Sequence, residues 1–465
     1  MPEAPSTPVI TRFAPSPTGY LHIGGVRTAL FNWLFAKRYN GQFLIRIEDT
    51  DKVRSTKDAV DAILDGLSWM GLESDVAPVS QSARASRHVE IAHQLLESGH
   101  AYRCFCSQEE LAAMRAAGHG YTGVWRDRDP GDAPSGVQSV LRFKAPLDGD
   151  SSISDAVQGD VRVNNSQLDD LIILRADGSP TYNLSVVVDD HDMAITHVIR
   201  GDDHLNNAFR QKAIYEALGW PVPVFAHIPL IHGKDGAKLS KRHGSLGVEA
   251  YRDMGMLPEG VFNYLLRLGW SHGDDEIFDQ EQATKLFSLE SIGRSPSRFD
   301  VEKMTSINHH WMQAAAPERL FEFALPFLSE AGLPTNEKAL ALLRRADASI
   351  KERSKTLRDY CKQAGFFIGG GPAEIDEKAA KALDNAGKIV LRDLIDVFDK
   401  IPQWSADVLQ ANLKDYATSK DLKLGKVFQP LRAALTGSMA SPGVVEVAEV
   451  IGKDETIARI RVQIQ

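Results

Sequence analysis

The opening of the chain alternates strand and helix signals, and this order restricts the fold more than any other feature. The β-rich segment VITRFA (residues 9–14) leads into the glycine turn PSPTGYLHIGG, and apolar residues then recur at helical spacing up to Gly41, a candidate helix C-cap. A second strand, QFLIRIE, and an amphipathic helix over residues 57–70 follow. This β-α-β-α order predicts a doubly wound parallel sheet.

The same order returns much later in the chain. HVIRGDD (197–203) reads as a strand, the next segment as a helix that Gly219 ends, and VFAHIPLIHG as one further strand. Residues 82–183, which lie between, contain a capping box at Ser107 and Glu110 and a DGSP turn between β-like segments. We therefore expect a nucleotide-binding type of fold that an α+β insertion divides.

A length of 465 residues exceeds what one hydrophobic core usually organises. Strand signals fade beyond Gly244, and the rest reads as helices joined by glycine and proline turns. The predicted architecture is a multidomain chain: an α/β doubly wound, Rossmann-like parallel-sheet domain, split by an α+β insertion and followed by an all-α C-terminal region. The expected segments are 1–81 and 184–235 for the sheet domain, 82–183 for the insertion, 236–320 for a linking region, and 321–465 for the helical region.

Composition is that of a water-soluble globular protein. Hydrophobic residues make up 43% of the chain and charged residues 25%, and no apolar stretch is long enough to span a bilayer. MPEAPSTPVI lacks the pattern of a secretory signal, and the three cysteines are too few for a disulfide framework. We expect a cytoplasmic protein without a membrane partner. A monomer is the expected oligomeric state, although no residue pattern decides it.

The net charge of −9 argues against a general nucleic-acid binder, because phosphate affinity comes mostly from Lys and Arg. An RNA partner would need a local basic patch. Residues 344–358 carry six Lys or Arg in what reads as one helical stretch. A solvated helix face of mixed charge explains this segment equally well.

Two segments have the residue types that bind a nucleotide. In the turn of residues 15–25, glycines let a backbone approach a nucleotide, the following helix offers its N-terminus to phosphate, and His22 adds a donor. KLSKRHG (238–244) follows the last predicted strand, and its cationic side chains could close over a triphosphate. Either segment alone could be an ordinary turn, but together they predict one nucleotide site.

These segments resemble the class I aminoacyl-tRNA synthetases, whose HIGH and KMSKS signatures match residues 22–25 and 238–242. TRFAPSPTGYLHIGG, IRIEDTD, PTYNLSVVVDD, VIRGDDHL and KLSKRHG narrow the resemblance to glutamyl-tRNA synthetases of the bacterial type. KLGKVFQPLRAALTGS is similar to the family's C-terminal helical domain, so the resemblance covers nearly the whole chain. Gly25 departs from the second His of the class signature, as is common in this family.

The resemblance implies activation of L-glutamate with ATP and Mg²⁺ to glutamyl-adenylate, followed by transfer to the 2′-hydroxyl of the 3′-terminal ribose of tRNA(Glu). It implies that 82–183 binds the acceptor end, that 236–320 contacts the stem, and that 321–465 binds the anticodon. The implied catalytic residues are His22, Lys238, Ser240, Lys241 and Arg242. The implied ATP contacts are Pro15, Ser16, Gly19, His22, Gly24, Gly25, Asp203, His204 and Lys241.

A glutamate side chain has to be bound as an anion, which guanidinium groups do with paired hydrogen bonds. Arg12 and Arg200 each stand near the carboxyl end of a predicted parallel strand, where open sheets bind ligands. An ordinary surface arginine at a strand end would explain either residue alone, but it explains the presence of both less well. The family's glutamate-binding positions correspond to Arg12, Ala14, Ser16, Glu48 (for the α-ammonium), Tyr182, Asn183 and Arg200 (for the side-chain carboxylate). Without the resemblance, Glu48 reads equally well as an acid that caps the next helix.

Some members of this family bind zinc in the insertion through a Cys-x-Cys pair and a second pair downstream. Cys104 and Cys106 are present here, but Trp125 and Asp127 stand where the second pair would fall. Two thiolates cannot complete a closed tetrahedral site, so we expect no bound zinc and assign no residue of the chain to a metal site. Whether Cys104 and Cys106 bind another metal stays open. If zinc were present, His119 would be the first substitute ligand to consider.

The resemblance implies that specificity for the tRNA depends on the C-terminal region. Arg353 lies in a segment that resembles the family's anticodon-contacting helix, where an arginine can read the last anticodon base. A phosphate contact or an internal ion pair is the alternative. The rival functions are a form that also charges tRNA(Gln), a truncated paralogue that would lack 321–465, a glutaminyl enzyme with a β-barrel C-terminal region, and a non-catalytic tRNA-binding relative.

Overall fold

The structure is a computed structural model, and it describes residues 8–19, 21–51, 54–117, 121–237, 239, 247–372 and 374–465. It consists of two compact units. The first contains residues 1–250 and 262–300, and the second contains residues 251–261 and 301–465. None of the helices within the described residues combines the length and the apolar character needed to cross a membrane.

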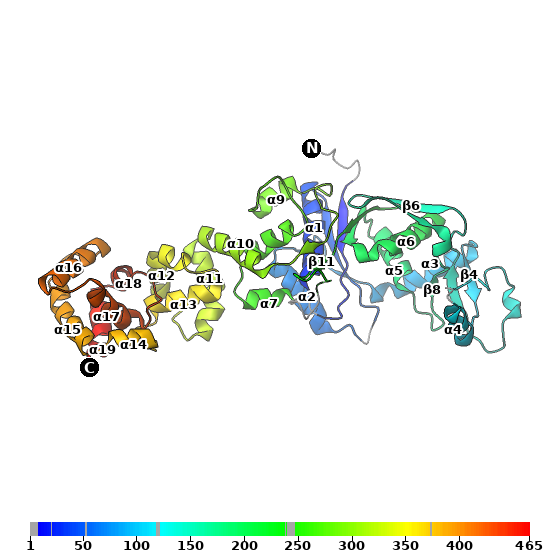
Figure 1. The fold of residues 1–465 in the computed structure, drawn as a ribbon. Helices are drawn as coiled ribbons and strands as arrows, with labels where there is room; N and C mark the ends of the chain where they lie inside the picture. Colours follow the sequence, from blue (N-terminus) through cyan, green and yellow to red (C-terminus); the bar gives the residue numbers. More distant parts are fainter. Residues whose placement is uncertain are drawn as a thin grey trace. The chain divides into compact units, whose positions relative to one another are not determined.

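Parallel strands form the centre of the first unit (Figure 1). β1 (Ile10–Phe13) pairs with β2 (Gln42–Ile47), β2 pairs with β3 (Val79–Ser80), and β9 (His197–Gly201) pairs with β10 (Val224–Ile228). β1 and β9 begin side by side, where the Thr196 amide donates a hydrogen bond to the Ile10 carbonyl at 2.9 Å. The predicted doubly wound parallel arrangement is confirmed.

The helices between these strands begin and end at residues that satisfy free backbone groups. Thr56 caps α2 (Lys57–Trp69) by accepting a hydrogen bond from the Ala59 amide, and Gly71 turns the chain with a φ of 70°. α6 (Leu205–Ala217) ends before Gly219, whose φ is 67°. Both helices agree with the prediction.

The end of α1 (Ile23–Arg38) differs from the prediction, because Gly41 is not the residue that turns the chain. Asn40 takes the left-handed conformation, with a φ of 52°. Gly41 serves a different purpose: a Cβ at this position would lie 2.0 Å from the Val9 carbonyl oxygen. Only glycine therefore lets β2 start beside β1.

The insertion is α+β, as predicted. Ser107 and Glu110 exchange the hydrogen bonds of a capping box, with distances of 2.8 and 3.2 Å, and Gly178 turns the DGSP segment with a φ of 78°. The elements of this region are β4 (Ala101–Cys104), β5 (Val140–Phe143) and β8 (Ile172–Leu174) in one antiparallel sheet, the hairpin β6 (Asp150–Asp155) and β7 (Gly159–Asn164), and the helices α3 (Ala85–Glu97) and α4 (Gln108–Ala116). α5 (Tyr182–Asp192) follows at the end of the insertion.

The prediction of one continuous strand in VFAHIPLIHG is wrong. β10 stops at Ile228, and a separate short strand, β11 (Ile231–His232), follows and pairs with β12 (Ser297–Arg298). Pro229 lies in the break, and a proline has no N–H to donate to a strand ladder. Between β11 and β12, the described residues form the helices α7 (Val248–Asp253), α8 (Pro258–Arg267) and α9 (Gln280–Leu286).

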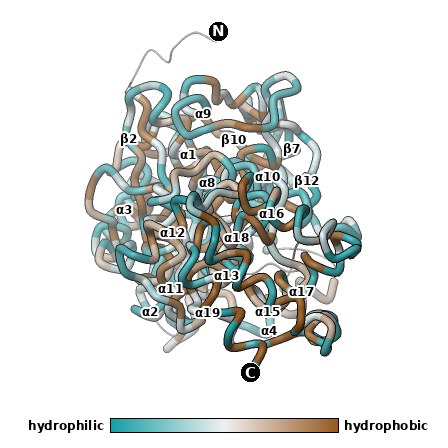
Figure 2. The backbone as a smooth tube through the Cα atoms, turned by 90° about the vertical axis from the view of Figure 1, so that its left-hand side faces the viewer, coloured by the Kyte–Doolittle hydropathy of each residue, from teal (hydrophilic) through white to brown (hydrophobic). Residues whose placement is uncertain are grey.

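The second unit is helical, as predicted, and its described residues contain no strand. Hydrophobic and hydrophilic residues alternate along its helices, which is the pattern of amphipathic helices (Figure 2). The helices are α10 (Val301–Ala314), α11 (Pro317–Glu330), α12 (Glu337–Lys351), α13 (Leu357–Ile368), α14 (Glu377–Ala382), α15 (Asn385–Asp399), α16 (Ala406–Ser419), α17 (Gly425–Thr436), α18 (Val444–Ile451) and α19 (Lys453–Ile464).

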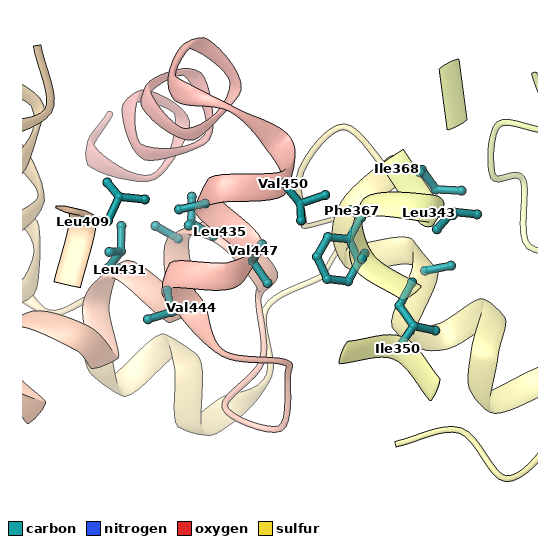
Figure 3. Close-up of a cluster of buried hydrophobic side chains, with 14 of the residues drawn as sticks. Leu343, Ile350, Phe367, Ile368, Leu409, Leu431, Leu435, Val444, Val447 and Val450 are labelled. Atoms are coloured by element: carbon teal, nitrogen blue, oxygen red, sulfur yellow. The ribbon is translucent and has the colours of Figure 1, made fainter. Parts of the chain in front are cut away.

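α18 is the apolar centre of this unit and packs against α12, α13, α16, α17 and α19. Val444, Val447 and Val450 are buried on it, and Figure 3 shows Val450 close to Phe367 of α13. Each fully buried aliphatic side chain of this kind stabilises the fold by about 1.5–3 kcal/mol. Residues from both ends of the unit therefore share one core.

The predicted single helix over residues 344–358 is wrong. α12 ends at Lys351 and α13 begins at Leu357, with a turn between them. The Ser354 hydroxyl donates to the Ile350 carbonyl at 2.7 Å, and Thr356 caps α13 in a capping box with Asp359. Arg353 therefore lies in the turn, where it is exposed.

Candidate active site

A cavity of about 840 Å³ opens at the carboxyl ends of the parallel strands in the first unit. Its walls come from β1 and the turn after it, the start of α1, the end of β2, the start of α5 and the end of β9. The predicted site residues that line it are Arg12, Ala14, Pro15, Ser16, Gly19, His22, Gly24, Gly25, Glu48, Tyr182, Arg200, Asp203 and His204.

The other predicted residues lie elsewhere. Asn183 does not line the cavity, and its Oδ1 accepts a hydrogen bond from Gln211 Nε2 at 3.1 Å. Arg353 belongs to the second unit. Lys238, Ser240, Lys241 and Arg242 lie outside the described residues.

The turn between β1 and α1 forms one end of the cavity. His22 caps α1, since its Nδ1 accepts a hydrogen bond from the Gly25 amide at 3.2 Å. A Cβ on Gly24 would lie 3.1 Å from the His22 imidazole. The glycine therefore leaves room for the imidazole that caps the helix.

The other end of the cavity contains charged side chains that are almost completely buried. Arg12 donates two hydrogen bonds to Asp190, one from Nε at 3.1 Å and one from Nη2 at 3.2 Å. Arg46 Nη1 donates to the same carboxylate at 2.5 Å, and Arg46 Nη2 donates to Glu48 at 3.2 Å. The Glu48 amide also donates to the Pro15 carbonyl at 2.9 Å, which ties the end of β2 to the glycine turn.

Protonation of these carboxylates depends on burial and on the neighbouring arginines. Burial raises the pKa of Glu48, and Arg46 and Arg12 oppose that increase. For Asp190, burial also disfavours the charged form, but Arg12 and Arg46 outweigh it and lower the pKa. Asp190 is therefore a carboxylate near neutral pH and acts as the shared counter-charge of the two arginines.

Arg200 stands apart from this ion-pair network. Only 6% of the residue is exposed, and burial lowers the pKa of its guanidinium. Nε donates to His227 and Nη2 to the His204 carbonyl, and Nη1 has no hydrogen-bond partner among the described residues. No carboxylate in the described chain accepts a hydrogen bond from Arg200.

Sequence reasoning missed four residues that build this site. Arg46 and Asp190 pair with predicted residues, His227 holds Arg200, and Arg27 lines the cavity from α1. Arg27 donates to the carbonyls of Leu268 and Pro229, and burial lowers its pKa to about 10. A signal was present for Arg27 and Arg46, because each is a charged residue inside an apolar run.

A second cluster surrounds the cysteine pair of the insertion. Cys104 donates to the Tyr121 hydroxyl at 3.3 Å, that hydroxyl accepts a hydrogen bond from the Trp125 amide at 3.1 Å, and Trp125 packs against Phe105. Burial raises the pKa of the Cys106 thiol to about 11. Within the described residues, which exclude His119, no group of three or more His, Cys, Asp or Glu side chains could hold a metal.

Residues 8–306 match the family described as "tRNA synthetases class I (E and Q), catalytic domain", and residues 319–464 match an anticodon-binding domain. "Glutamate--tRNA ligase 2" of Rhodospirillum rubrum is 59% identical and covers 97% of this chain and 98% of its own length. "Glutamate--tRNA ligase 2" of Paramagnetospirillum magneticum is 56% identical and covers 97% of this chain and 96% of its own length.

A solved structure agrees with these sequence matches. The crystal structure of a glutamate tRNA ligase from Elizabethkingia meningosepticum, in complex with its amino acid, has a TM-score of 0.86 and 34% identity and covers 98% of this chain and 99% of its own. The predicted fold and the predicted resemblance to glutamyl-tRNA synthetases are confirmed. The chain belongs to the class I tRNA synthetases of the glutamate and glutamine group.

Proposed function

We propose that this protein is a glutamate–tRNA ligase, which activates L-glutamate with ATP and transfers it to the 3′-terminal ribose of tRNA(Glu). The observation that carries the proposal is the state of Arg200, a buried guanidinium on the cavity wall that donates no hydrogen bond to a carboxylate of the described chain. A buried charge is costly without a partner, so this site favours an anionic guest.

The glutamate would lie at the end of the cavity that holds Arg12, Glu48 and Arg200. Arg200 would bind the side-chain carboxylate, and Glu48 would accept hydrogen bonds from the α-ammonium. Because burial raises the pKa of Glu48, the incoming ammonium would favour its charged form. Ala14, Ser16, Tyr182 and Asn183 would complete the pocket; Asn183 would have to turn from Gln211 or act through it.

ATP would lie at the end formed by the glycine turn and the start of α1. Pro15, Ser16, Gly19, Gly24 and Gly25 would contact it closely, Asp203 and His204 would lie beside it, and His22 would donate to its phosphate. Lys238, Ser240, Lys241 and Arg242 would act on the triphosphate from the KLSKR segment. Mg²⁺ would bind the triphosphate of ATP and would reduce the negative charge of that triphosphate.

The reaction requires alignment more than proton transfer. The α-carboxylate of glutamate is already ionised near neutral pH, so its oxygen attacks the α-phosphorus of ATP without a general base. A new O–P bond forms while the bond to the departing pyrophosphate breaks, and the charge on that leaving group is stabilised by His22 and Lys241. In the second step, the 2′-hydroxyl of the tRNA attacks the glutamyl carbonyl and AMP leaves.

The tRNA would contact three parts of the chain. Residues 82–183 would bind the acceptor end, residues 236–320 the stem and residues 321–465 the anticodon, with Arg353 exposed in the α12–α13 turn to meet a base. We propose further that the protein acts as a cytoplasmic monomer and holds no zinc.

The test is aminoacylation of purified tRNA(Glu) and tRNA(Gln), side by side, with labelled glutamate. We expect charging of tRNA(Glu). Charging of both tRNAs would identify a form that does not discriminate between them. Charging of neither, with no glutamate-dependent exchange of pyrophosphate into ATP, would favour a non-catalytic tRNA-binding protein and contradict the proposal.

A further inference from the structure

Arg200 is held in place by a histidine on the neighbouring strand. Arg200 on β9 and His227 on β10 are register partners in a parallel pair, so the backbone sets their side chains next to each other. Arg200 Nε lies 3.1 Å from His227 Nε2, and Arg200 Nη2 lies 3.4 Å from the His204 carbonyl oxygen. These two contacts leave Nη1 as the donor without a partner in the described chain.

The contact between Arg200 and His227 requires one form of the imidazole. A guanidinium can only donate hydrogen bonds, so His227 Nε2 must accept and the ring proton must lie on Nδ1. Asp155 provides the reason for that form, because its Oδ2 lies 2.6 Å from Nδ1 and both side chains are fully buried. Burial lowers the pKa of His227, against the opposing effect of Asp155, which agrees with a neutral ring.

Asp155 is itself fixed by the backbone at the end of β6. Its Oδ1 accepts hydrogen bonds from the amides of Val157, Gln158 and His227, at 3.0, 2.9 and 3.0 Å. Gln158 Nε2 also donates to the His227 carbonyl at 2.9 Å. The hairpin of the insertion is thus attached to β10 at the histidine that contacts Arg200.

We propose that Asp155 and His227 are positioning residues for the glutamate site: the carboxylate fixes the imidazole tautomer, and the imidazole fixes Arg200 with Nη1 left for the substrate carboxylate. Neither residue lines the cavity, so their effect on the substrate passes through Arg200. The inference rests on the proposed function, since it takes Arg200 as the group that binds the glutamate side chain. It makes glutamate affinity depend on a hairpin of the insertion.

The first test variant is Asp155→Asn in the full-length protein. An asparagine can keep the three amide contacts at Oδ1, but its NH₂ group replaces Oδ2 and must donate to His227 Nδ1. The ring proton then moves to Nε2 and faces the Nε–H of Arg200, so two donors oppose each other. Because hydrogen bonds to charged groups are the strong ones, we expect the KM for glutamate to rise about 10-fold or more, with the KM for ATP and kcat near wild type.

The second test compares two replacements of the histidine. The amide of asparagine takes the place of Nδ1, so His227→Asn can keep the bond to Asp155 but offers no acceptor to Arg200. The amide oxygen of glutamine reaches the place of Nε2, so His227→Gln can still accept from Arg200. We expect a raised glutamate KM in His227→Asn and a value near wild type in His227→Gln, measured by pyrophosphate exchange with tRNA present.

Controls separate this inference from a general loss of structure and from failure of the proposed function. His197→Gln removes another buried histidine, on β9 and outside the cavity lining, and should leave the glutamate KM unchanged.

If Arg200→Lys raises the glutamate KM but Asp155→Asn and His227→Asn do not, the inference is wrong and the proposed pocket stands. If Arg200→Lys also has no effect, the pocket itself is wrong. Equal changes in the KM for ATP and glutamate, together with a lower Tm, would mean a structural role only and would contradict the inference.

Discussion

Asp190 binds Arg12 through both of its carboxylate oxygens, at 3.1 and 3.2 Å, and also accepts a hydrogen bond from Arg46 at 2.5 Å. One buried carboxylate on α5 therefore holds an arginine from β1 and an arginine from β2. Arg12 consequently reaches the cavity in a fixed orientation, with its Nε and Nη2 already occupied by the protein. The ion pairs of Arg12 and Arg46 are therefore complete before any substrate arrives, whereas Arg200 has no carboxylate partner in the described chain.

Asp190→Asn should destabilise the first unit strongly, because the two buried arginines would lose their shared negative charge. We expect the free energy of unfolding at pH 7 to fall by about 3 kcal/mol or more, as measured by urea denaturation. Asp192→Asn on the same helix is the matched control. Its partners Arg84 and Arg87 are partly exposed, so the expected loss is below about 1 kcal/mol. Equal losses for both variants would contradict this explanation.

His197 should make stability depend on pH in the mildly acidic range. Burial lowers its pKa to about 4, whereas a histidine in an unfolded chain titrates near pH 6.5. Between these values the unfolded chain binds more protons than the folded one, so the stabilisation is present above about pH 6.5 and is lost as the pH falls toward 4. We expect the wild type to lose about 2 to 3 kcal/mol more than His197→Gln between pH 7 and pH 4.5. Parallel pH profiles for the two proteins would show that His197 stays protonated, or solvated, in the fold.

The cysteine pair of the insertion should need no metal. Trp125 is almost fully buried there, Tyr121 accepts from Cys104, and the raised pKa of Cys106 disfavours the thiolate that zinc requires. We expect metal analysis of the purified protein to find no stoichiometric zinc, and a zinc-selective chelator, added with Mg²⁺ in excess, to leave aminoacylation unchanged. One zinc per chain would contradict this prediction.

Trp125→Ala should lower the free energy of unfolding by about 3 kcal/mol, because it opens a cavity in this small core.

Arg353 is the proposed reader of the anticodon. Arg353→Gln should lower the ratio of kcat/KM for tRNA(Glu) over tRNA(Gln), because an arginine can stack on a base and hydrogen-bond its edge. Lys355→Gln removes a charge from the same exposed turn and is the control for a general loss of phosphate attraction. Identical kinetics of wild type and Arg353→Gln on both tRNAs would refute the assignment.

The sequence predicts the parts of the site that follow from local pattern. Arg12 and Arg200 are recognisable as charged residues at the ends of apolar strands, and the glycine turn indicates the start of a helix. Because open parallel sheets bind ligands at the carboxyl ends of their strands, these residues are expected to lie at one site. The structure brings both arginines to the same cavity.

Contacts between residues that are distant along the chain could not be predicted from the sequence. Arg46 meets Asp190 across 144 positions, and His227 meets Asp155 across 72 positions. No periodicity or turn signal connects such residues, because their contact depends on how segments far apart in the chain pack together. Local errors have local causes: Pro229 interrupts a strand that reads as continuous, and the Ser354–Thr356 turn divides a helix that reads as one.

On the proposed function, the cavity selects an amino acid with an anionic side chain for reaction with ATP. The most direct measurement is pyrophosphate exchange into ATP, with tRNA present, in parallel reactions that contain glutamate, glutamine or no amino acid. We expect exchange with glutamate, little exchange with glutamine, and a loss of the preference for glutamate in Arg200→Gln. Equal exchange with both amino acids in the wild-type protein, or exchange that does not depend on glutamate, would contradict it.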